Sequence, residues 1–80
     1  MPDDTRVYEL VEIVGSSKDG VEQAIKAAVA RTARTVQGLD WVEVQQVRGV
    51  VTNGAVSEFQ VVLKVGFRVM EPEELKKKRK

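Results

Sequence analysis

The chain of 80 residues has no cysteine, no histidine and a net charge of +1, which excludes disulfides, thiolate metal sites and histidine-based catalysis. This length allows one domain at most, and its core would bury only about 60–65% of the unfolded chain's surface, so we expect oligomerisation to supply stability. Residues 71–80 carry five of the 13 basic and three of the 12 acidic side chains, and the remaining 8 basic and 9 acidic residues argue against a basic face for nucleic acid.

The first residues show neither a targeting segment nor a membrane span. MPDDTRVYEL has no basic start followed by an apolar run, so no signal peptide is expected. No apolar stretch approaches the roughly 20 residues that a membrane helix needs. We therefore expect a soluble, cytoplasmic protein that does not contact a membrane.

Residues 5–14, TRVYELVEIV, are rich in Val, Ile and Tyr and predict a strand. Apolar side chains fall on both of its faces, which indicates that both are at least partly covered. Residues 15–20, GSSKDG, are typical of a turn, in which Ser17 or Asp19 could accept hydrogen bonds from the first free amides of a helix.

A helix of about 18–20 residues is predicted next, because apolar residues recur at helical spacing. Many of these residues are alanine, which permits a close approach to a sheet. Gly38 is expected to end the helix in the left-handed conformation, with Leu39 folding back on the last turn. The apolar stripe consists of Val21, Ala24, Ile25, Ala28, Val29, Thr32, Ala33 and Val36.

Two strands and a tight turn complete the predicted fold. Residues 41–51 form the second strand and residues 57–69 the third, and Asn53-Gly54 between them is the strongest short hairpin signal. The predicted fold class is α+β, a β-α-β-β subunit with one long helix on a three-stranded antiparallel sheet. One face of the third strand alternates without a break and should be buried: Phe59, Val61, Leu63, Val65, Phe67 and Val69.

The only tryptophan, Trp41, is predicted to lie on the sheet face away from the helix. If the Asn-Gly pair forms the loop, Trp41 lies opposite Gly66 and Val47 opposite Gln60. Gln60 then shares the face of Trp41 at about 20 Å along the sheet, so a small ligand could contact both only where a second subunit completes the site. Arg48 would point to the helix side, unless a bulge at Arg48 and the following glycine turned it outward.

Three segments closely resemble the dodecins, small flavin-binding proteins that form hollow spherical dodecamers. They lie within residues 6–69 and read RVYELVEIVGSS, AIKAAVARTARTVQGLDWVEVQQVRG and GAVSEFQVVLKVGF. The resemblance implies a homododecamer with a flavin site at a two-fold axis between subunits. The tail EPEELKKKRK departs from the family pattern, so we expect a single dodecin-like domain over residues 1–70 and a charged tail over 71–80.

The resemblance also implies roles for three residues. Trp41 would stack on the isoalloxazine ring, with two flavins sandwiched between symmetry-related tryptophans. Gln60 would hydrogen-bond the pyrimidine edge of the flavin, since an amide offers both a donor and an acceptor. Arg48 matches a basic side chain that bacterial members place near the ligand. FMN is the expected cofactor, riboflavin or FAD are alternatives, and coenzyme A is a further ligand associated with bacterial members.

A role in flavin storage and photoprotection follows from this resemblance, because a tryptophan in contact with a photoexcited flavin can donate an electron and quench it. No catalytic or metal-binding residue is assigned, and the protein is not expected to be an enzyme. The alternatives are a ligand-free structural or interaction shell, in which Trp41 packs an interface, and a minor flavin-dependent redox enzyme. Arg48 could instead pair with Glu43 or Glu58, and KKKRK could contact nucleic acid or polyphosphate.

Overall fold

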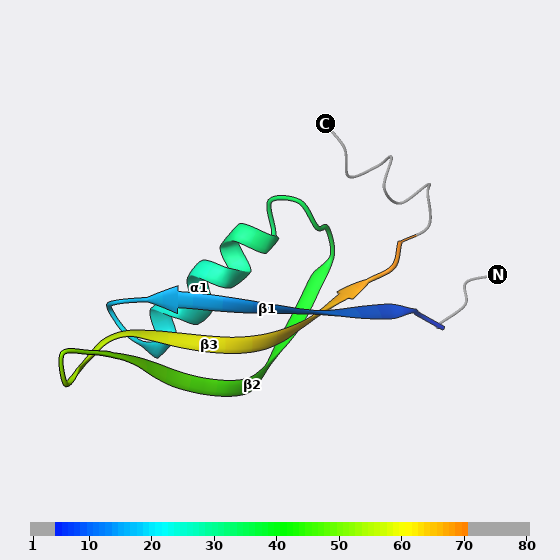
Figure 1. The fold of residues 1–80 in the computed structure, drawn as a ribbon. Coiled ribbons are helices and arrows are strands. Elements are labelled where there is room, and N and C mark those ends of the chain that lie inside the picture. Colours follow the sequence, from blue (N-terminus) through cyan, green and yellow to red (C-terminus); the bar gives the residue numbers. More distant parts are fainter. Residues whose placement is uncertain (1–4, 71–80) are drawn as a thin grey trace.

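The computed structural model describes residues 5–70, which form one helix and three strands (Figure 1). The elements are β1 (Tyr8–Ser17), α1 (Val21–Thr32), β2 (Leu39–Thr52) and β3 (Ala55–Arg68). The strands form an antiparallel sheet in the order β1-β3-β2, and α1 lies on one side of it. This confirms the predicted α+β class and element order. No helix in this part of the chain is long and apolar enough to cross a membrane.

The core lies between α1 and the central strand β3. It is a small cluster of fully or almost fully buried residues: Ala24, Ala28, Val61, Leu63 and Val65. The helix approaches so closely that a Cβ atom added at Gly15 of β1 would lie 2.2 Å from the carbonyl oxygen of Ala24. Glycine and alanine therefore hold α1 against the sheet. The predicted burial of the β3 face holds only in its middle, because Val69 at its end is 48% exposed.

The helix is shorter than the predicted 18–20 residues, since α1 ends at Thr32 after 12 residues. Beyond it the amides of Thr35 and Val36 both bond to the carbonyl of Thr32, at 3.1 and 3.0 Å. β-branched threonines favour a helix less than alanine does, so the apolar stripe continues into a turn. Gly38 has the predicted positive φ, of 80°, but its carbonyl accepts the amide of Arg68 at 3.0 Å and so leads into β2.

The predicted helix cap is wrong. The N-cap residue is Gly20, with no side-chain hydrogen bond to the first turn, and Ser17 Oγ accepts the amide of Asp19 at 3.0 Å instead. Strand β1 also runs three residues further than expected, because residues 15–17 pair with residues 59–61 of β3. Backbone pairing in the sheet therefore outweighs the turn composition of GSSKDG.

The hairpin between β2 and β3 follows the prediction at both ends but not in its middle. Asn53 and Gly54 form the turn with φ of 53° and 79°, and Trp41 lies opposite Gly66. Between these points the register slips by one residue in each strand, after Val44 and after Val50, so that the second slip cancels the first. The expected pairing of Val47 with Gln60 is wrong, since Arg48 lies opposite Gln60.

Ser57 accounts for the slip near the turn. Its Oγ donates to the carbonyl of Val50 at 3.2 Å and lies 3.0 Å from Thr52 Oγ1. These bonds give the extra β3 residue a partner where the strand ladder has none.

Helix α1 does not cover strand β2. Helix α1 packs mainly against β1 and β3. As a result Val42, Val44 and Val47, which lie opposite the buried row of β3, are 37%, 49% and 50% exposed. We call these three residues the β2 valine row. A protomer of this shape leaves apolar surface uncovered beside its own core.

Candidate ligand-binding face

Trp41 lies on the sheet face opposite α1, as predicted. A Cβ atom added at Gly66 would lie 2.4 Å from the indole ring, whereas one added at Gly15 would meet α1. Gly66 and Gly15 project to opposite faces, because Gly66 pairs with residue 10 of β1 and side chains alternate along a strand. The indole therefore rests directly on the backbone of β3 and stays 38% exposed. We call this side of the sheet the outer face.

Tyr8 contacts Trp41 across the central strand. The centroids of the two rings are 5.1 Å apart, and their planes are inclined by 59°. Because Gly66 has no side chain, rings from β1 and β2 can meet above β3. Sequence reasoning did not include Tyr8 in the site. The signal was its position on the outer face of β1, but it could be interpreted only once β3 was known to be central.

A chain of polar side chains crosses all three strands at the other end of the outer face. Arg48 donates from Nη1 to Gln60 Oε1 at 2.9 Å and from Nη2 to Gln46 Oε1 at 3.0 Å. Gln60 Nε2 donates to Glu58 Oε2 at 3.5 Å, and Ser16 Oγ donates to the same oxygen at 2.5 Å. We call these five residues the polar chain.

The structure brings Gln60 and Arg48 together and leaves Trp41 apart from them. Arg48 reaches the outer face because the register slips after Val44, not because of a bulge at Arg48 itself. Its side chain forms hydrogen bonds to two glutamines and no ion pair with Glu43 or Glu58. Trp41 lies opposite Gly66, six β3 residues from Gln60, which is about 20 Å at roughly 3.3 Å per residue.

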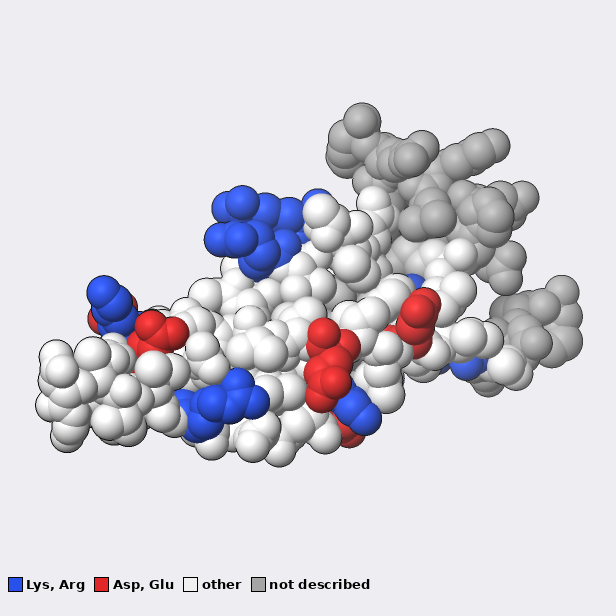
Figure 2. All heavy atoms as spheres, in the orientation of Figure 1, with Lys and Arg blue, Asp and Glu red and all other residues white. Residues whose placement is uncertain are grey.

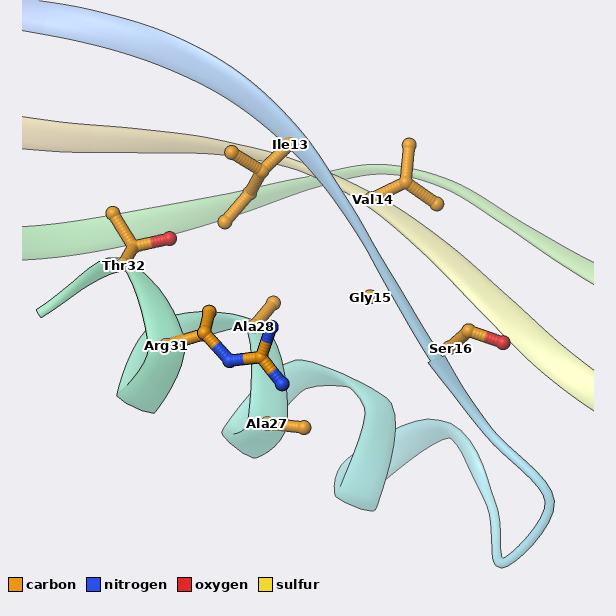
Figure 3. Close-up of a pocket in the computed structure, with 8 residues that line it drawn as sticks. All are labelled: Ile13, Val14, Gly15, Ser16, Ala27, Ala28, Arg31 and Thr32. Carbon is orange, nitrogen blue, oxygen red and sulfur yellow. The ribbon is translucent and has the colours of Figure 1, made fainter. Parts of the chain in front are cut away.

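Two hollows lie beside the sheet, and neither encloses both ends of this face. A hollow of about 280 Å³ lies between β1 and α1, and Arg31 is the charged side chain beside it (Figure 3). Another, of about 240 Å³, touches Trp41 and lies among Val29, Leu39 and Val65. Neither includes a member of the polar chain other than Ser16, which lines the hollow in Figure 3. A ligand that contacts both Trp41 and Gln60 therefore needs a second protomer.

Charge is mixed on the visible surface. Figure 2 shows basic side chains gathered over α1 and small groups of both signs over the sheet. Among residues 5–70 no group of three or more Asp or Glu residues is placed to hold a metal ion.

The polar chain itself contains one cation, Arg48, and one anion, Glu58, so it suits a ligand edge with alternating donors and acceptors rather than a strongly charged group.

Comparison with known proteins gives consistent matches over the folded region. A family model described as Dodecin matches residues 7–70. The dodecin of Thermus thermophilus is 52% identical over 66 residues, which are 82% of this chain and 96% of that protein. The solved structure of the tt0972 protein from Thermus thermophilus has a TM-score of 0.80 and 51% identity, covering 84% of this chain and 98% of the other. Dodecin from Streptomyces coelicolor has a TM-score of 0.82 and 48% identity, covering 86% and 99%.

Proposed function

The chain belongs to the dodecin family, and from this membership and the geometry of the outer face we propose that it binds flavins at sites shared between protomers. The observation that carries the proposal is the separation of Trp41 and Gln60 on one face, about 20 Å apart. Each protomer offers a stacking surface at one end and a hydrogen-bonding edge at the other. A neighbouring protomer would bring the second feature beside the first.

We propose that Trp41 stacks on the isoalloxazine ring, with paired flavins between symmetry-related tryptophans. The indole is supported by the backbone of Gly66 and flanked by Tyr8, yet 38% of Trp41 is exposed, so a flat ring can be placed on it without rearrangement of the core. A ring-on-ring contact adds about 0.5–1.5 kcal/mol to the free energy of burying the same area. The tilted Tyr8 ring leaves the stacking position to the ligand.

We propose that Gln60 hydrogen-bonds the pyrimidine edge of the flavin and that Arg48 lies beside it. FMN is the proposed cofactor, riboflavin and FAD share the same ring, and coenzyme A is proposed as a further ligand of the assembly. Arg48 supports this arrangement because its guanidinium is bonded to Gln60 and still has donors to spare.

We propose that the protomers assemble into a homododecamer. The β2 valine row is exposed beside the core, and further apolar side chains are exposed on the outer face, with Leu10 at 49% and Val14 at 54%. Exposed apolar side chains that gather on a sheet face in this way are typical of protein interfaces. The domain would be residues 1–70. The charged tail over residues 71–80 lies outside the described residues, and we propose that assembly does not need it.

Storage and photoprotection of flavin, rather than catalysis, is the role that we propose. An indole stacked on a photoexcited flavin is an electron donor at contact distance, so the excited state would return to the ground state before it reacts. Two flavins packed between tryptophans would also leave little room for a substrate beside the reactive ring.

The test is a titration of the full chain, freed of bound flavin, with FMN, followed by flavin fluorescence and by FMN retention on ultrafiltration. The parent is expected to retain FMN and extinguish its fluorescence, and Trp41→Ala to lose at least about tenfold in affinity, which is about 1.4 kcal/mol. Val51→Ala, at a valine that is 67% exposed near the hairpin, serves as the control and should bind as the parent does. A Trp41→Ala variant that quenches fully contradicts the stacking role.

Two other outcomes would favour the alternatives. An assembled parent that retains no FMN, riboflavin or FAD would indicate a ligand-free shell. Sustained oxidation of NADH or NADPH by the flavin-loaded assembly would indicate a redox enzyme.

A further inference from the structure

We propose that Glu58 is a positioning residue, which together with Arg48 fixes the orientation of the Gln60 amide and so the order in which its acceptor and donor meet the ligand. This inference rests on the proposed flavin function, because it describes how the same site recognises the ring edge.

The two ends of the Gln60 amide face groups of opposite charge. The Arg48 guanidinium donates to Oε1 at 2.9 Å, and the Glu58 carboxylate accepts from Nε2 at 3.5 Å. A guanidinium has only donors and an ionised carboxylate only acceptors, so the reversed amide would set donor against donor and acceptor against acceptor. Hydrogen bonds to charged partners are also stronger than those between neutral groups. One amide orientation is therefore favoured.

Both charged partners are themselves held by the outer strands. Ser16 of β1 donates to Glu58 Oε2 at 2.5 Å, and Gln46 of β2 accepts from Arg48 at 3.0 Å. Gln60 lies on the central strand β3. It pairs with Ser16 of β1 on one side and with Arg48 of β2 on the other. The amide orientation is consequently set within a single protomer, before any ligand or partner arrives.

The fixed orientation has a consequence for the ligand. A carboxamide has two lone pairs and two N–H groups, and the polar chain uses one of each. One acceptor and one donor remain for a ligand. The acceptor, Oε1, belongs to the end of the amide that Arg48 contacts, and the donor, Nε2, to the end that Glu58 contacts. The pyrimidine edge of a flavin presents carbonyl, N–H and carbonyl in sequence, so this order determines which of the two carbonyls is paired and where the ring lies on the indole.

The experiment compares riboflavin with riboflavin methylated at N3, which lacks the imide N–H. Dissociation constants for both are measured with the full-length assembled parent, Glu58→Gln, Gln60→Ala and the double variant. Glu12→Gln serves as a matched control, because Glu12 lies on the same face opposite Lys64 but outside the polar chain. Light scattering checks that each variant is assembled as the parent is.

The parent should prefer riboflavin, and Glu58→Gln should reduce that preference by about threefold to tenfold without weakening the methylated analogue. In the Gln60→Ala background, Glu58→Gln should change neither constant, because positions that act through one group are not additive. Equal losses for both ligands, or an unchanged preference, overturn the inference while the flavin function stands. A parent that binds neither ligand overturns the proposed function as well.

Discussion

Gly66 shapes the outer face through the side chain that it lacks. A Cβ atom added at Gly66 would lie 2.4 Å from the Trp41 indole, so the indole occupies the volume that this atom would need. Tyr8 contacts the same indole from β1, on the other side of β3. Any side chain at this position would lift the indole from the sheet and separate the two rings. The orientation of the Trp41 indole thus depends on the missing side chain of Gly66.

We expect Gly66→Ala to weaken FMN binding by about tenfold, because the indole must move and overpacking a tight contact costs about 1–3 kcal/mol. Fluorescence titration with FMN measures the loss, and near-ultraviolet circular dichroism reports the change around Trp41. Gly54→Ala is the control, since an added Cβ there meets nothing within 4 Å. Equal affinity of Gly66→Ala and the parent would show that the indole position does not govern binding.

At the scale of elements, the contact of α1 with β1 likewise depends on a glycine without a side chain, here Gly15. A Cβ atom at Gly15 would lie 2.2 Å from the carbonyl oxygen of Ala24 and 2.9 Å from the Cβ of Ala28. The backbone oxygen cannot rotate away as a flexible side chain could, so the helix as a whole would have to shift. This shift would open the small core between α1 and β3.

Gly15→Ala should therefore lower the free energy of unfolding by about 1–3 kcal/mol. Thermal unfolding at equal protomer concentration is the measurement, because association makes the midpoint depend on concentration. Gly54→Ala again provides the comparison, since its φ of 79° strains alanine but the space around it is open. If Gly15→Ala unfolds at the midpoint of the parent, α1 is not packed as closely as described.

Local patterns predicted the elements well, and long-range contacts account for what they missed. Alternation in β3 predicted the buried positions Val61 and Val65, and Asn53-Gly54 predicted the turn, because both depend on residues close in sequence. The slip at Ser57 depends on its bonds to a strand across the turn, which composition does not reveal. The early end of α1 coincides with a turn in which the amides of Thr35 and Val36 share the carbonyl of Thr32, and the helical spacing of the apolar residues does not reveal this turn.

For the candidate site too, local sequence patterns predicted some features and missed others. The face of Trp41 followed from alternation and from the glycine opposite it, whereas the one-residue slip hid the pairing of Arg48 with Gln60. Sequence alone also gave no strand order, so the contact between Tyr8 and Trp41 could not be expected. The roles of Trp41, Gln60 and Arg48 toward flavin remain predictions until ligand binding is measured.

At the scale of the whole molecule, the described protomer exposes large apolar side chains on both faces of its sheet. The β2 valine row flanks the core on one side of the sheet, and Leu10, Val14 and Trp41 are exposed on the other. Association would cover both, and each fully buried valine or leucine contributes about 1.5–3 kcal/mol. These exposed apolar surfaces lie within the described residues 5–70.

We therefore expect a chain that lacks residues 71–80 to assemble with the same stoichiometry as the full chain. Multi-angle light scattering of both chains gives the molar masses. Val44→Lys, which would bury a charge if the β2 valine row is an interface, should by contrast shift the protein toward smaller species. A monomeric truncated chain would assign the tail a part in assembly.

The distance between Trp41 and Gln60 also has a genetic consequence. If one protomer supplies the indole and its neighbour the amide, a chain damaged at Trp41 still carries a sound Gln60, and a chain damaged at Gln60 still carries a sound Trp41. Two alleles that are each defective alone would then complement one another in mixed particles. Where the two kinds of chain meet, one half-site has both Trp41 and Gln60, and the half-site that faces it has neither.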